Sequence, residues 1–64
     1  MSPEEIEVFI KDSIATLRIL SDRKSPRLGE LIAVYLADLA YLLKVGNLTE
    51  NDYNELIHPD NLHF

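Results

Sequence analysis

The fold of this chain is decided by residues 28–45, which read LGELIAVYLADLAYLLKV. Apolar side chains recur there every three or four residues, which is the spacing of one face of an α-helix. Ser25 and Pro26 precede the stretch as an N-cap and a first helical residue, and Gly46 follows it where helices often end in a left-handed residue. We therefore predict a helix over residues 26–45, about 30 Å long at 1.5 Å per residue.

This helix is apolar on nearly all sides, a pattern typical of a helix that is buried all round. Large apolar side chains occupy its broad face, and the opposite side carries small residues where polar ones are usual. Small side chains allow a second helix to approach closely. We expect the interface to be formed by Ala33, Val34, Ala37, Ala40 and Tyr41.

Asp38 is the one charged residue in the middle of the apolar stretch. A buried carboxylate needs a partner, so Asp38 either forms a pair across an interface or lies at a boundary where it reaches water or a tyrosine hydroxyl. The boundary position is favoured. Catalysis has little support, because no second catalytic group stands at a defined spacing from Asp38.

A second long helix is predicted over residues 3–21. Ser2, Pro3 and Glu5 form the pattern of a capping box with proline in the first helical position. The polar connection over residues 21–25 is short, and helices joined so closely are usually antiparallel neighbours.

The far side of this helix carries a narrower apolar stripe formed by Val8, Ala15 and Ile19. Two interpretations are open. Either the third helix or the tail covers the stripe, or the stripe adds to the contact surface of the central helix.

A short third helix is predicted over residues 50–58. Thr49 is its N-cap, Asp52 takes the capping-box position, and Leu48 and Tyr53 form a hydrophobic staple. The tail over residues 59–64 contains two apolar residues and either packs back on the helices or stays free as a docking peptide.

These elements predict one all-α domain over residues 1–64, an antiparallel two-helix hairpin with a short third helix across its open end. A chain of this length buries only about 60% of its unfolded surface. One hairpin and one short helix cannot cover all sides of the central helix, so we expect a homodimer with a four-helix core. The predicted core is Ile6, Phe9, Ile10, Ile14, Leu17, Leu31, Ile32, Tyr35, Leu36, Leu39, Leu42, Leu43, Tyr53, Leu56 and Ile57.

Composition narrows the possible partners. The chain has 11 acidic and 6 basic residues and a net charge of −5, which disfavours nonspecific binding to nucleic acid or to an anionic membrane. The apolar run over residues 31–37 lies between Glu30 and Asp38 and is too short to span a bilayer. The chain has no cysteine, which favours a cytoplasmic location.

Basic residues gather at the bend between the two long helices, at Arg18, Arg23, Lys24 and Arg27. With the free N–H groups of a helix start, they could bind an anion or an acidic partner. A solvated turn near Asp22 explains the same charges and is favoured. An antiparallel dimer, in which basic ends meet acidic ends, explains them as well.

The chain lacks the motifs of common catalytic sites. It has no glycine-rich phosphate loop and no cysteine nucleophile, and His58 and His63 are not spaced as a helical metal-binding pair. We therefore predict no enzyme activity, no cofactor and no metal. The leading prediction is a small acidic adaptor, inhibitor or regulator, of the kind frequent among bacterial and phage accessory proteins, with itself and an unidentified protein as partners. The alternative is a nucleic-acid-binding regulator that uses the basic bend.

Overall fold

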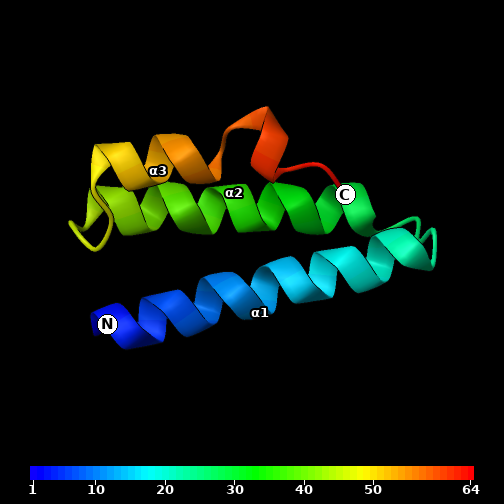
Figure 1. Ribbon diagram of the computed structural model, residues 1–64, viewed down its shortest axis with the longest axis horizontal. Coiled ribbons are helices and arrows are strands. Elements are labelled where there is room, and N and C mark those ends of the chain that lie inside the picture. Colours follow the sequence, from blue (N-terminus) through cyan, green and yellow to red (C-terminus); the bar gives the residue numbers. More distant parts are fainter.

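The computed structural model describes residues 1–64 as three helices without strands (Figure 1). Helix α1 spans Pro3–Asp22, α2 spans Leu28–Lys44 and α3 spans Glu50–Leu56, and a short 3-10 helix, η1, spans Pro59–Asn61. The central helix α2 lies between α1 and α3 and runs antiparallel to both (Figure 1). The molecule measures 34 × 21 × 17 Å. The predicted all-α architecture with three helices is confirmed, and none of these helices has the length and apolarity to cross a membrane.

Helix α1 begins with the predicted capping box. The Ser2 hydroxyl accepts a hydrogen bond from the Glu5 N–H at 3.2 Å, and Glu5 Oε1 accepts one from the Ser2 N–H at 3.3 Å. Pro3 is the first helical residue, where its missing N–H leaves no bond unmade. The hydrogen bonds from Ser2 favour the charged carboxylate and lower the pKa of Glu5 below its usual range.

Helix α1 ends in a Schellman motif, although the residue in its left-handed position is not a glycine. Lys24 adopts a left-handed conformation with φ of 52°. Its N–H donates to the Ser21 carbonyl at 3.0 Å, and the Ser25 N–H donates to the Leu20 carbonyl at 2.9 Å. This motif reverses the chain and directs it toward α2.

Helix α2 begins at Leu28, two residues later than predicted. The Ser25 hydroxyl accepts from the Arg27 N–H at 3.2 Å, and the Leu28 N–H donates to the Ser25 carbonyl at 3.2 Å. Ser25 therefore caps a single tight turn through Pro26 and Arg27, because its hydroxyl bonds to the N–H two residues later. The regular helix starts only after this turn.

Gly46 ends α2 as predicted, with φ of 82° in the left-handed region. Its N–H donates to the Leu43 carbonyl at 3.1 Å, and the Asn47 N–H donates to the Leu42 carbonyl at 2.8 Å. These two bonds form a second Schellman motif. It turns the chain back so that α3 packs along α2.

Thr49 caps α3 as predicted, and its hydroxyl accepts from the Asp52 N–H at 3.1 Å. The helix ends at Leu56, two residues before the predicted end. His58 then starts η1, where its Nδ1 atom accepts from the Asp60 N–H at 3.2 Å. Pro59 follows His58 and holds its backbone in an extended conformation, with ψ of 137°, so the helix cannot continue and ends early.

The tail packs back on the helices. Asn61 Nδ2 donates to the Glu55 carbonyl at 2.7 Å, and the same carbonyl accepts from the His58 N–H at 3.2 Å, so the tail is tied to the end of α3. Leu62 and Phe64 are partly buried against the core. Of the two arrangements considered for the tail, the structure shows the packed one.

Five apolar residues form the buried core, and Leu39 among them has no exposed surface. Two residues predicted for the core, Leu36 and Leu43, are only partly buried and lie outside this cluster. The reason is that α3 has only seven residues against the seventeen of α2 and covers only part of it. The buried residues are Ile6, Leu17, Tyr35, Leu39 and Leu42.

Candidate interaction surfaces

The outer face of α2 is uncovered. All five residues predicted for its interface are exposed, namely Ala33, Val34, Ala37, Ala40 and Tyr41. Val34 is 50% exposed and Tyr41 is 63% exposed, and Val45 at the end of the helix is 47% exposed. Large apolar side chains around a stripe of alanines form an apolar surface, with the exposed Glu30 and Lys44 near its two ends. Such a surface is typical of a protein contact site.

The stripe on the far side of α1 is uncovered as well. Val8 is 56% exposed, Ile19 is 51% exposed, and Ala15 is also exposed. The interpretation that α3 or the tail covers this stripe is therefore wrong. The structure leaves the stripe open to solvent along much of α1.

The two stripes do not form one surface. Val8, Ala15 and Ile19 lie on the side of α1 opposite the residues that pack toward α2, because helical positions repeat every 3.6 residues. On α2, the alanine stripe likewise lies on the side opposite the buried Tyr35 and Leu39, while Val34 at its edge also lines a hollow between α2 and α1. The two stripes therefore point away from each other, and one flat partner cannot contact both.

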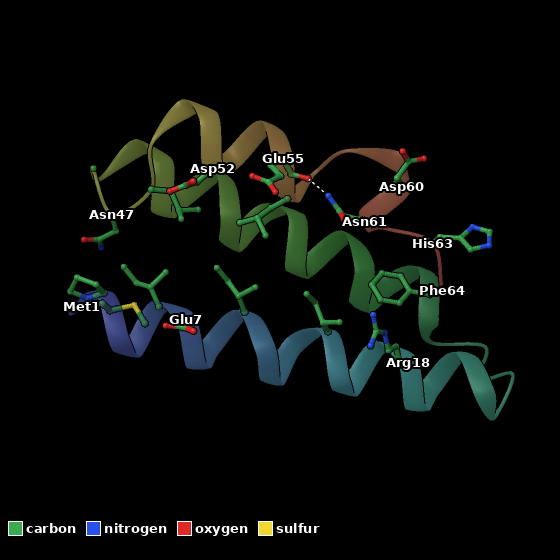
Figure 2. A pocket seen from close by; sticks show the side chains of 17 residues that line it. Met1, Glu7, Arg18, Asn47, Asp52, Glu55, Asp60, Asn61, His63 and Phe64 are labelled. Atoms are coloured by element: carbon green, nitrogen blue, oxygen red, sulfur yellow. Dashed lines mark hydrogen bonds between the residues drawn. The ribbon is translucent and has the colours of Figure 1, made fainter.

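The basic bend is exposed, but its charges have separate surroundings. Arg23 and Lys24 lie in the connection itself. Arg27 Nε lies 3.8 Å from Glu30 Oε2, in a pair that is open to solvent. Arg18 is directed toward the space between α1 and the tail, near the end of the chain (Figure 2). The four cations thus do not share one anion site.

Asp38 is exposed on α2, at the boundary position. It borders a small hollow of about 280 Å³ between α1 and α2. Tyr35 also lines this hollow, and its buried hydroxyl has no hydrogen-bond partner. Asp38 therefore does not accept a hydrogen bond from Tyr35. Burial raises the pKa of Tyr35, because the apolar surroundings disfavour the phenolate.

A larger groove of about 1050 Å³ lies between α1 and the segment formed by α3 and the tail (Figure 2). We call it the α1–α3 groove. No pattern in the sequence predicts this groove, because it depends on the separation of two helices that α2 holds apart. Seven of its 17 lining residues are apolar, namely Met1, Ile6, Ile10, Ile14, Leu48, Leu56 and Phe64.

The rim of the α1–α3 groove is acidic. Asp52 and Glu55 extend from α3, Glu7 extends from α1 on the other side, and Asp60 lies on the tail (Figure 2). Arg18 is the only lysine or arginine among the lining residues. The sequence contained a signal for this rim, since residues 50–64 hold four carboxylates and no lysine or arginine.

Two of the four carboxylates on the rim already have a basic side chain beside them. Glu7 Oε1 lies 2.9 Å from Lys11 Nζ, and Asp60 lies 3.6 Å from His58 Nδ1. The other two, on α3, form no ion pair. They are the acidic groups most available to a basic partner.

The two histidines have separate surroundings. His58 uses Nδ1 to start η1, and His63 lies at the groove on the tail. The structure contains no group of three or more histidine, cysteine or acidic residues placed to hold a metal ion.

Comparisons with protein-family models, curated proteins and solved structures found no match to this chain.

Proposed function

We propose that this chain is a small non-enzymatic protein-binding module, an adaptor, inhibitor or regulator, that self-associates through the outer face of α2. The observation that supports this most directly is the exposure of Val34 and Tyr41 beside the alanine stripe of Ala33, Ala37 and Ala40. The small stripe lets two α2 helices approach closely, and the larger side chains would pack at its edge.

The total solvent-exposed area of the chain supports the proposal that a partner covers part of its surface. The chain exposes 4780 Å². A compact monomer of 7.3 kDa is expected to expose about 4,200 Å². The excess of about 600 Å² approaches the roughly 800 Å² that each partner buries in a standard protein interface. Self-association would cover a surface of this size.

The alternative function, a nucleic-acid-binding regulator, has less support. The basic bend would have to contact phosphates, but Arg27 is beside Glu30 and Arg18 is directed elsewhere. The acidic α3 would repel a nucleic acid that extended along the bundle.

We also propose a cytoplasmic location, which rests on the cysteine-free composition. The comparison with bacterial and phage accessory proteins rests on composition alone.

The test is the mass in solution by light scattering, over about a hundredfold range of concentration, where dissociation by mass action becomes visible. We expect dimers of the 7.3-kDa chain. Ala37→Glu places a charge in the proposed interface and is expected to give monomers that keep their helical circular dichroism. Ala15→Glu is the matched control on the opposite stripe, and it is expected to remain dimeric.

Either of two outcomes would contradict this assignment. One is a wild-type chain that stays monomeric at every concentration. The other is an Ala37→Glu variant with the mass and melting temperature of the wild type. If Ala15→Glu alone dissociated the dimer, the interface would lie on the α1 stripe.

A further inference from the structure

We infer that the α1–α3 groove binds a cationic amphipathic helix of a partner protein. This inference deepens the proposed function, since it names the class of partner that a non-enzymatic binding module would take. It uses a surface different from the outer face of α2. A dimer formed through α2 would therefore leave the groove free.

The shape of the groove fits a helix. Ile6, Ile10 and Ile14 line it at four-residue intervals and form an apolar row along α1. The lining residues of α1 extend from Pro3 to Arg18, about 22 Å at 1.5 Å per residue, or four helical turns. A partner helix with apolar residues at i, i+3, i+4 and i+7 would place them along this row, as in other helix-in-groove complexes.

The α3 side of the groove adds apolar contacts, and the two ends of the groove limit the length of a partner helix. Leu48 and Leu56 line the groove from the α3 side and are partly buried. The tail places Phe64 beside Arg18 at one end of the groove (Figure 2). A partner helix of about four turns therefore fits between this end and the end formed by Met1.

The charge of the rim selects a basic partner. Asp52 and Glu55 form no ion pair, and both line the groove. Lysine or arginine residues along the polar flanks of a seated helix would meet these carboxylates. An acidic helix would be repelled, and so would the phosphates of a nucleic acid. Arg18 would accommodate an acidic residue at one end of the partner helix.

The probe is a synthetic helical peptide of about 16 residues, long enough for four turns, with leucines on one face and lysines on the others. Binding is measured by amide chemical shifts of the isotope-labelled chain during titration. We expect shifts along the groove side of α1 and in α3. A matched peptide with glutamate in place of every lysine is expected to cause none.

The charge argument is tested with a double variant, Asp52→Asn with Glu55→Gln. Both side chains are exposed, so the fold should be retained, and circular dichroism checks this. We expect affinity for the lysine peptide to fall about five- to tenfold at low salt, because two partly exposed ion pairs are lost. The control is Asp12→Asn with Asp22→Asn, which removes the same charge away from the groove and should change affinity less than about twofold.

Several results would overturn the inference. One such result is a set of shifts confined to the outer face of α2, and another is equal binding of the lysine and glutamate peptides. A third is the absence of shifts at a peptide concentration of about 1 mM, at which binding stronger than about 4 kcal/mol would be detected. Equal losses in the two double variants would also do so, since attraction would then come from net charge alone. None of these results affects the light-scattering test, so the proposed function can stand when the groove inference fails.

Discussion

Replacing Tyr35 with phenylalanine is expected to increase the stability of this chain. A buried tyrosine is usually weakened by this change, because its hydroxyl normally donates a hydrogen bond. Tyr35 is only 3% exposed, and its buried hydroxyl has no hydrogen-bond partner. The folded state therefore keeps a polar group away from water without compensation.

The magnitude follows from the hydroxyl alone, because the aromatic ring stays in place. Burying a hydroxyl without a partner costs about 1–3 kcal/mol, and the small void left by its removal offsets part of the gain. We expect Tyr35→Phe to raise the free energy of unfolding by about 0.5–1.5 kcal/mol. For a domain of this size, 1 kcal/mol corresponds to about 4–8 °C in melting temperature.

Alkaline pH provides a second signature. Burial raises the pKa of Tyr35 above that of an unfolded chain, where tyrosine ionises near pH 10. The unfolded state then loses its proton first, so ionisation of Tyr35 leaves the free energy of unfolding unchanged below about pH 10 and lowers it as the pH rises through the raised pKa. Tyr35→Phe is expected to remove this part of the alkaline loss.

The assay is urea unfolding followed by circular dichroism at one fixed protein concentration, since self-association changes apparent stability. Tyr41→Phe is the matched control, because Tyr41 is 63% exposed and the change keeps the ring that the proposed dimer would bury, so the free energy of unfolding should change by less than about 0.5 kcal/mol. A loss of more than about 0.5 kcal/mol in Tyr35→Phe alone would refute the reasoning, since it would mean that the hydroxyl has a partner.

Four further predictions test the core and the helix ends. Leu39→Ala should lower the free energy of unfolding by about 2–5 kcal/mol in urea melts, because Leu39 is fully buried. A smaller loss would mean that the core collapses around the void. Gly46→Ala should lower it by about 1 kcal/mol although a Cβ meets nothing within 4 Å, since φ is 82°. Lys24→Gly should raise the free energy of unfolding by up to about 1 kcal/mol. A stabilising Gly46→Ala or a destabilising Lys24→Gly would contradict the left-handed conformation of these residues. Glu5→Gln should flatten the fall of melting temperature in acid, because the lowered pKa of Glu5 gives stability that is lost as the pH falls through it.

Several helix ends could be predicted because their causes are local. The capping box at Ser2, the left-handed Gly46 and the Thr49 cap each depend on hydrogen bonds within a few residues. The start of α2 differs from the prediction because the Ser25 hydroxyl and the Ser25 carbonyl together close a tight turn before the helix begins. The Schellman motif at Lys24 was not foreseen, because lysine carries no preference for a positive φ.

The candidate surfaces also differ in how far the sequence predicts them. The exposed alanine stripe of α2 was expected from residue spacing, and the structure leaves it uncovered. The carboxylates of α3 were visible in the sequence, but nothing showed that Asp52 and Glu55 face an apolar row on α1. That relation depends on how α2 separates α1 from α3, and no local pattern encodes a separation.

Side-chain periodicity and capping chemistry thus account for the three helices, the hairpin and the apolar excess of α2, because these act over a few residues. Long-range packing accounts for the rest. It directs the stripes of α1 and α2 away from each other, and it opens the acidic groove beside Ile10 and Ile14. The physical reason is the extent to which one helix covers another. A helix as short as α3 can shield only part of α2, and where it packs determines which surfaces remain available to a partner.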